Sequence, residues 1–139
     1  MQTNSRSSRL VKVIVIIIMI FAVVSITFMW WTYPRSTLSF PVTFTIGAAN
    51  QEKAFDVPVF DNSVQVQVKI NNGASLWQAS ILTSNGTAIW SHQKAQGEQT
   101  IYSSGFFALD SGSYTFTFAA LGAGALDAQI DIQAKGGFW

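Results

Sequence analysis

The chain of 139 residues has no cysteine and only one histidine, His92. Without cysteine the fold has no disulfide, and a lipoprotein anchor, which is attached through a cysteine, is excluded. A zinc or copper site of the usual kind needs several Cys or His ligands, so we expect His92 to be a rim or surface residue of a strand. Four residues that might bind calcium match no calcium-loop spacing and stand where turns are expected: Asp56, Asp61, Asn62 and Asp110. We therefore predict no metal and no cofactor.

Charged residues are also scarce, at 11% of the chain, and they are unevenly placed. The segment up to Arg35 has four basic residues and no acidic one: Arg6, Arg9, Lys12 and Arg35. The rest has four lysines and seven acidic residues, so it offers no basic patch for nucleic acid. Its other polar positions are mostly Gln, Ser, Thr and Asn. Two explanations stay open: partner subunits cover this surface, or it faces a medium, such as acid, in which charges are unfavourable.

No pattern typical of a catalytic site is found. The tripeptide Asp110-Ser111-Gly112 resembles the sequence around the nucleophile of chymotrypsin-like proteases, but the chain is too short for two barrels. A turn accounts for these three residues. Alternating strand and helix patterns are missing, which excludes a nucleotide-binding α/β fold. We predict that the protein is not an enzyme.

One long apolar run, Val13–Trp31, contains only two polar residues, Ser25 and Thr27. As a helix rising about 1.5 Å per residue it spans roughly 28 Å, close to the hydrocarbon thickness of a bilayer. We predict a transmembrane helix over 13–33, which Pro34 ends. Residues 1–12 are then a basic cytoplasmic segment, 34–37 a linker and 38–139 an extracytoplasmic domain, because cytoplasmic flanks carry the excess of Lys and Arg.

The aromatic residues at the outer end of this run, Trp30, Trp31 and Tyr33, are expected in the headgroup layer. A cleaved signal peptide is the first alternative, but the run is long and ends in Phe28-Met29-Trp30-Trp31, without a small-residue cleavage site. The second alternative is a type IV pilin or archaeal flagellin, whose apolar helices resemble this one. Those proteins have a Gly-containing processing site and a longer helix, whereas here no glycine precedes Gly47. An uncleaved anchor in the plasma membrane is the preferred interpretation.

After Arg35, short segments alternate between apolar and polar residues, as strands buried on one face do. The clearest places Val64, Val66, Val68 and Ile70 on one face. Pro41 and Pro58 indicate edge strands, and Asn85-Gly86 predicts a hairpin with a type I′ turn, which needs positive φ at both residues. We predict seven or eight strands in an antiparallel β-sandwich, either immunoglobulin-like or jelly-roll, with the strand order left open.

The segment Leu109-Asp110-Ser111-Gly112-Ser113-Tyr114 has the form L-x-x-G-x-Y at the start of a late strand. It resembles the strand entry of many extracellular sandwiches, among them carbohydrate-binding modules, pre-peptidase C-terminal domains and GOLD-type domains. The resemblance implies that Gly112 permits a tight turn and that Tyr114 packs at the edge of the sandwich. It covers a few residues and implies a fold class, not a function.

Three features suggest interaction surfaces. Asn85-Gly86-Thr87 is an N-glycosylation sequon at an expected hairpin tip. A sugar-stacking platform could be formed by Trp77, Trp90, Tyr102 and Trp139, although Trp77 and Trp90 are expected in the core. Phe138 and Trp139 follow two glycines, which should leave the backbone free to reach a partner subunit or the headgroup layer.

The sequence therefore predicts a structural protein, a non-enzymatic accessory subunit of a larger membrane complex, such as a respiratory or oxidase-type assembly or an envelope layer. Its partners would be the lipid bilayer and other membrane subunits. The alternative is a membrane-anchored module that binds carbohydrates or surfaces. A filament subunit of the pilin or archaellum type is the third candidate.

Overall fold

The computed structural model describes residues 4–45, 50–73, 76–94, 100–121 and 125–137. The chain divides into two compact units, Met1–Tyr33 and Pro34–Trp139, which are considered separately.

The first unit is a single helix, α1 (Asn4–Thr32), which is long and apolar enough over Ser7–Thr32 to span a membrane, a criterion that a signal sequence also meets. It begins before the predicted span, at Asn4, so the helix includes most of the basic segment as well as the apolar run. Two of its threonines bond within the helix: the hydroxyls of Thr27 and Thr32 donate to the carbonyls of Val23 (2.8 Å) and Phe28 (3.0 Å). These hydroxyl groups therefore have hydrogen-bond partners without water, as polar groups inside a bilayer require. The helix ends just before Pro34, as predicted.

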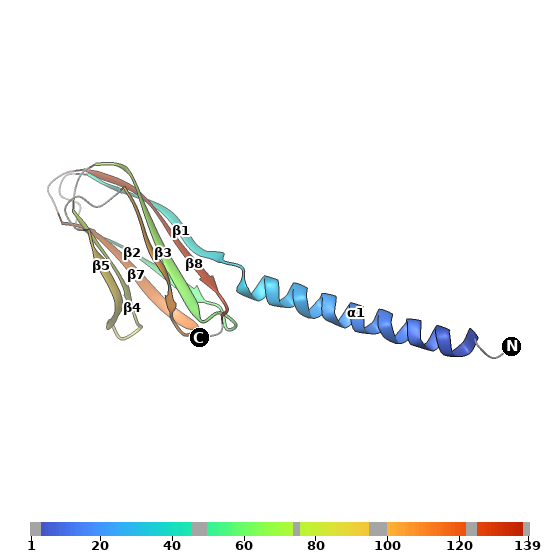
Figure 1. The fold of residues 1–139 in the computed structure, drawn as a ribbon. Helices are drawn as coiled ribbons and strands as arrows, with labels where there is room; N and C mark the ends of the chain where they lie inside the picture. The colour runs from blue at the N-terminus through green and yellow to red at the C-terminus, as the bar shows by residue number, and fades with distance from the viewer. Residues whose placement is uncertain (1–3, 46–49, 74–75, 95–99, 122–124, 138–139) are drawn as a thin grey trace. The chain divides into compact units, whose positions relative to one another are not determined.

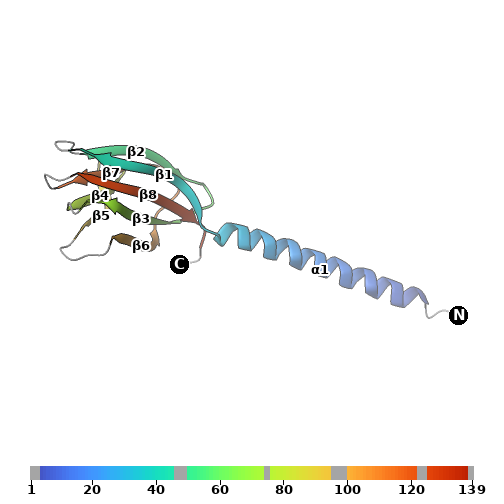
Figure 2. The ribbon, with the colours of Figure 1, turned by 90° about the horizontal axis from the view of Figure 1, so that it is seen from above.

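The second unit is a sandwich of two four-stranded antiparallel sheets (Figures 1 and 2). This confirms the predicted fold class and its upper strand number. The strands are β1 (Arg35–Phe44), β2 (Asn50–Val57), β3 (Ser63–Asn72), β4 (Trp77–Leu82), β5 (Ala88–Gln93), β6 (Ile101–Ala108), β7 (Gly112–Ala120) and β8 (Leu126–Lys135). Strand β1 begins at Arg35, so most of the predicted linker 34–37 belongs to the strand.

The strand order settles the alternative that the sequence left open. One sheet has the order β1-β8-β3-β6 and the other β2-β7-β4-β5. Strand β1 pairs with β8, β2 with β7, β3 with β6 and β4 with β5, as if one long hairpin had been rolled up around its tip. Eight strands arranged in this way form a jelly roll, not an immunoglobulin fold.

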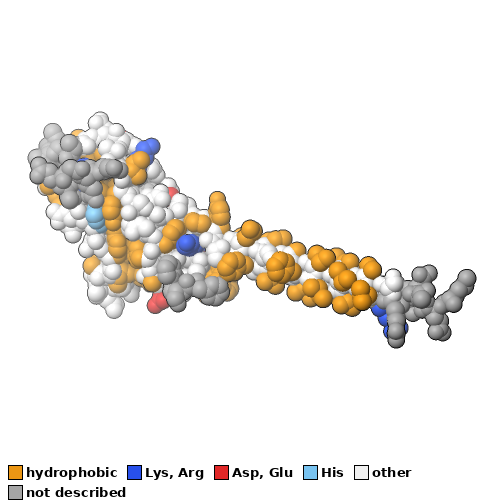
Figure 3. Space-filling model, in the orientation of Figure 1, with side chains coloured by type: hydrophobic (Ala, Val, Ile, Leu, Met, Phe, Trp, Pro, Cys, Tyr) orange, Lys and Arg blue, Asp and Glu red, His pale blue; other side chains and the backbone are white. Residues whose placement is uncertain are grey.

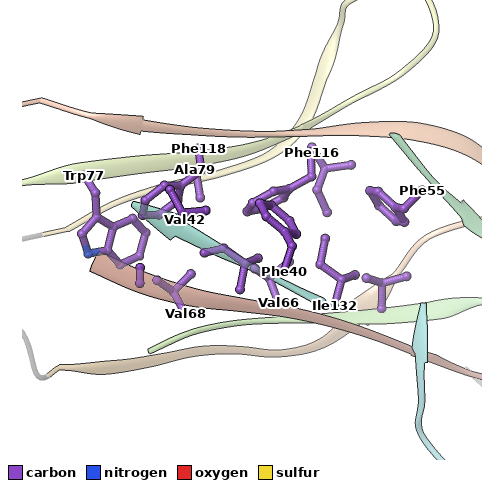
Figure 4. Packing of buried hydrophobic residues seen from close by; sticks show 14 of the residues in the cluster. Phe40, Val42, Phe55, Val66, Val68, Trp77, Ala79, Phe116, Phe118 and Ile132 are labelled. Atoms are coloured by element: carbon purple, nitrogen blue, oxygen red, sulfur yellow. The ribbon is translucent and has the colours of Figure 1, made fainter. Parts of the chain in front are cut away.

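Alternating side chains from both sheets fill the core. Val64, Val66 and Val68 of β3 are fully buried, as are Ile130 and Ile132 of the neighbouring β8. Aromatic pairs connect the sheets: Phe40 meets Phe116 edge to face at 6.2 Å, and Phe44 lies parallel to Phe118 at 5.9 Å. Figure 4 shows these side chains meeting between the two layers. The inward face predicted for β3 is confirmed.

The prolines lie where a missing N–H is tolerated. Pro41 is in β1, which is at the edge of its sheet, and Pro58 directly follows β2, the edge strand of the other sheet. Both predicted edge positions are confirmed.

The hairpin at Asn85-Gly86 is present, but its predicted turn type is wrong. Gly86 has a φ of +79°, whereas no described residue other than glycine has a positive φ. The amide of Gly86 donates to the carbonyl of Thr83 (2.9 Å), and the amide of Thr83 donates to the carbonyl of Thr87 (2.9 Å). This pattern fits a type I turn followed by a glycine bulge, the usual form of a three-residue hairpin loop.

The strand entry at Gly112-Ser113-Tyr114 has the expected geometry. Gly112 has a φ of +152°, and the Tyr114 hydroxyl donates to the backbone carbonyl of Asp110 at 2.8 Å. A tyrosine that ties a strand to the turn before it is a known device of sandwich proteins. Burial and, to a lesser degree, the negative charge of Asp110 raise the pKa of Tyr114, so its hydroxyl stays protonated and able to donate to a higher pH than that of an exposed tyrosine.

Candidate functional site

The C-terminal end of α1, with Tyr33 just after it, carries the predicted interfacial aromatic residues. Trp30 and Tyr33 are exposed, and Phe28 contacts Trp31 edge to face with ring centres 6.2 Å apart. Rings with an apolar body and a polar tip favour the boundary between hydrocarbon and water. The arrangement therefore suits a helix that ends in the headgroup layer.

At one end of the sandwich, β1 and β3 begin and β8 ends; we call this the anchor end, because the chain enters it from α1. Arg35, the first residue of β1, forms an ion pair with Asp61 in the turn between β2 and β3. The Asp61 side chain is 0% exposed and that of Arg35 27% exposed. A carboxylate taken out of water is costly unless it is paired, so this contact holds the turn against β1.

The C-terminal segment is tied to the same place. The backbone amide of Asn62 donates to the carbonyl of Lys135 (3.1 Å), and its side-chain amide donates to the carbonyl of Gly137 (2.7 Å). The Ser63 hydroxyl adds a bond to the carbonyl of Lys135 (3.1 Å). Gly136 is buried. The expectation that the two glycines leave the backbone free is therefore wrong as far as Gly137. Phe138 and Trp139 lie outside the described residues.

A row of aromatic rings lies between the edge strands β5 and β6; we call Trp90, His92, Tyr102 and Phe107 the aromatic strip. His92 and Tyr102 stack with centroids 3.8 Å apart, and Trp90 lies parallel to Phe107 at 5.8 Å. Figure 3 shows apolar side chains running along this side of the sandwich, beside the single histidine. All four side chains are half-buried, so they close the gap between the two sheets.

The predicted sugar platform is only partly assembled. Trp77 is 1% exposed and belongs to the core, as expected, where it contacts Phe118 and Tyr102 at 5.4 and 5.8 Å. The ring centroids of Trp90 and Tyr102 are 6.4 Å apart. Trp139 is not among the described residues. His92 and Tyr102 cover one face of each other, which leaves less ring surface for a sugar.

Asn85 is exposed at the tip of the β4–β5 hairpin. The hairpin is closed by backbone bonds and by a bond from the Thr87 amide to the Thr83 hydroxyl (3.2 Å). These bonds do not involve the Asn85 side chain. The sequon is therefore sterically open to a glycosylating enzyme.

The described residues contain no group of three or more His, Cys, Asp or Glu side chains that could share a metal ion. The shallow hollows in the described part of the sandwich include the following two. One, of about 330 Å³, is lined by residues that include Phe44, Leu126 and Asp127; the other, of about 320 Å³, includes Asp110 and Tyr114. The Tyr114 hydroxyl is already bonded to the backbone of Asp110. Neither hollow pairs a nucleophile with a base.

No protein-family model matches the chain, and no curated protein sequence does. Among solved structures, the pre-peptidase C-terminal domain of a collagenase from Bacillus anthracis is similar, with a TM-score of 0.56 and 10% identity over 69% of this chain and 88% of that one. A mitogen from Yersinia pseudotuberculosis has a TM-score of 0.49 and 9% identity over 77% of this chain and 91% of that one. The first likeness confirms a generic β-sandwich. At this identity it shows the fold alone.

Proposed function

We propose that the protein is a non-enzymatic accessory subunit of a larger complex in the plasma membrane, anchored by α1 with the sandwich outside the cell. The observation that carries this proposal is the helix: it is apolar on all sides over residues 13–31, and none of its most apolar 18-residue window is buried within the structure. An exposed helix of this kind suits lipid as its surroundings, not water. The ion pair with Asp61 neutralises Arg35, which strengthens the charge difference between the two ends of α1.

The proposed topology is tested by labelling single cysteines in a chain that has none of its own. A membrane-impermeant maleimide added to intact cells should label Leu121→Cys, an exposed residue after β7, and should not label Ser8→Cys until the cells are opened. The opposite labelling pattern would contradict the orientation. A mature chain that begins after Trp31 would show instead that α1 is a cleaved signal.

Two features support a role within a complex. The surface of the sandwich has few charges, which suits a surface that partner subunits cover. In addition, the bond from the Asn62 side chain holds Gly137, the residue before Phe138, at the anchor end of the sandwich. We propose that the rings of Phe138 and Trp139 bind a neighbouring subunit or the headgroup layer.

The double substitution Phe138→Ser/Trp139→Ser should release the protein from its complex in mild detergent while the sandwich stays folded. Two buried rings cover roughly 300–400 Å², an upper limit of about 8–10 kcal/mol before the cost of ordering the tail, so a loss of a few kcal/mol is realistic. Co-purification of partner subunits with the tagged chain measures the effect. The substitutions leave in place the hydrogen bond that the Asn62 side-chain amide donates to the carbonyl of Gly137.

The matched control is Leu76→Ser/Leu121→Ser, which removes two exposed apolar side chains at the other end of the sandwich. This variant should keep its partners. Undiminished co-purification of the tail variant would rule out docking through the tail. If the tail variant unfolds instead, Trp139 belongs to the core.

The aromatic strip favours one alternative, a module that binds carbohydrates or surfaces. Trp90 is half-buried and so retains some exposed ring surface beside Tyr102. Loss of glycan binding in Trp90→Ala, with the fold preserved, would support that function over the accessory role. A filament subunit fits less well, because α1 ends at Thr32 and β1 begins at Arg35, whereas in pilins the helix continues past the membrane.

A further inference from the structure

The turn between β2 and β3 carries two large apolar side chains at its tip. Val59 is 81% exposed and Phe60 71%, the highest values for large apolar residues in the described part of the sandwich. Turns normally carry Gly, Asn, Asp, Ser or Pro at such positions. Two adjacent apolar residues held out in water are unfavourable, so this tip calls for an apolar environment outside the sandwich.

The turn is fixed and cannot fold its tip into the core. The amide of Asp61 donates to the carbonyl of Pro58 (2.9 Å), and the Asp61 carboxylate is buried against Arg35. The next residue, Asn62, accepts a bond from the amide of Leu109 (3.0 Å) through its carbonyl. Val59 and Phe60 are thus presented outward on a rigid support.

Chain connectivity limits how far this tip can lie from the end of α1. Arg35 contacts Asp61 directly, and only Pro34 separates Arg35 from Tyr33. Two residues span at most about 7 Å, and the headgroup region adds about 5–8 Å to each side of the hydrocarbon core. If α1 spans the bilayer to its last turn, the anchor end of the sandwich stays within reach of the interface.

We propose that Val59 and Phe60 insert into the interface of the outer leaflet and form a second membrane contact, within the sandwich itself. This inference rests on the proposed anchoring by α1. The charged residues on and around this turn are of both signs: Arg35 and Lys135 are basic, and Asp56, Asp61 and Asp110 are acidic. The contact is therefore apolar and does not need anionic lipid. It would restrict the tilt of the sandwich on its short connection.

The test uses the full chain in phosphatidylcholine vesicles, with a nitroxide spin label on a single cysteine. Oxygen collects in the apolar part of the bilayer, and a water-soluble nickel chelate, present on both sides, stays in water. Collisions of the label at Val59→Cys with oxygen, relative to those with nickel, should be several-fold more frequent than for the label at Leu121→Cys. Leu121 is the control because it is an exposed apolar residue at the opposite end of β7 from Gly112.

Equal collision ratios at the two positions, in chains that float with the vesicles, would overturn the second membrane contact and leave the anchoring by α1 intact. Chains that do not float with the vesicles would overturn both the anchoring and the inference that rests on it.

Discussion

Val66→Asp is expected to lower the free energy of unfolding of the sandwich by about 4 kcal/mol or more, because it buries a carboxylate that has no partner. Val66 is fully buried in the middle of β3, opposite Ile132 of β8 and close to the cross-sheet pair Phe40–Phe116 (Figure 4). Domains are stable by about 5–15 kcal/mol in total, so the variant should be near the limit of folding. Urea unfolding in mild detergent, followed by the circular dichroism of the β-sheet, measures the loss.

The control Gln67→Asp places the same group on the opposite face of the same strand. Gln67 is half-buried and opposite Asp131, so we expect a loss below about 1 kcal/mol from repulsion, which added salt should reduce. For Val66→Asp the deficit should instead shrink as the pH falls, since burial raises the pKa of the new carboxyl and its protonated form is neutral. Equal losses for the two variants would show that the faces of β3 have been assigned wrongly.

Arg35→Met is expected to cost about 3–5 kcal/mol, because it leaves the buried Asp61 carboxylate without its cation. The reverse change, Asp61→Asn, should cost less. The Arg35 side chain is 27% exposed and can be solvated, whereas that of Asp61 is 0% exposed. A larger loss for Arg35→Met than for Asp61→Asn would show that the pair is buried, because in a surface pair either change costs less than about 1 kcal/mol.

The double variant Arg35→Met/Asp61→Asn is the test of this explanation. It removes the cation and the charge that needed it, so it should be more stable than Arg35→Met alone. If the losses of the two single variants simply add, the ion pair is not what holds the turn, and the cost of Arg35→Met comes from packing. Thermal unfolding of all four chains in the same detergent gives the comparison.

The sequence was most informative where a signal is local. Alternation with a period of two identified the inward face of β3, and the length of the apolar run identified α1. The position of the β4–β5 hairpin was also predictable, because Asn85-Gly86 marks it within a few residues. The turn type was not, since a type I turn with a bulge also places Gly86 at positive φ and demands nothing unusual of Asn85.

Long-range pairing could not be predicted in the same way. Strand β1 pairs with β8 from Arg35↔Ala134 to Phe44↔Leu126, and no local pattern in either strand specifies the other as its partner. The ion pair between Arg35 and Asp61 was hidden for a related reason. An aspartate followed by asparagine indicates a turn, whether its carboxylate lies in water or is buried. The anchoring of Gly137 by Asn62 likewise depends on β3 and β8 being neighbours.

The place of β8 in its sheet has a consequence for how the protein is made. Strand β8 is synthesised after the other seven strands, yet it lies between β1 and β3 and pairs with both. Until β8 arrives, those two strands offer unpaired edges, and the core lacks Ile130 and Ile132. On the proposed topology, α1 is already in the membrane before β8 has been made and the sandwich can be completed. A chain interrupted before Leu126 should therefore remain incompletely folded and sensitive to proteases at the cell surface. A chain that includes β8 can close the sandwich and should resist them.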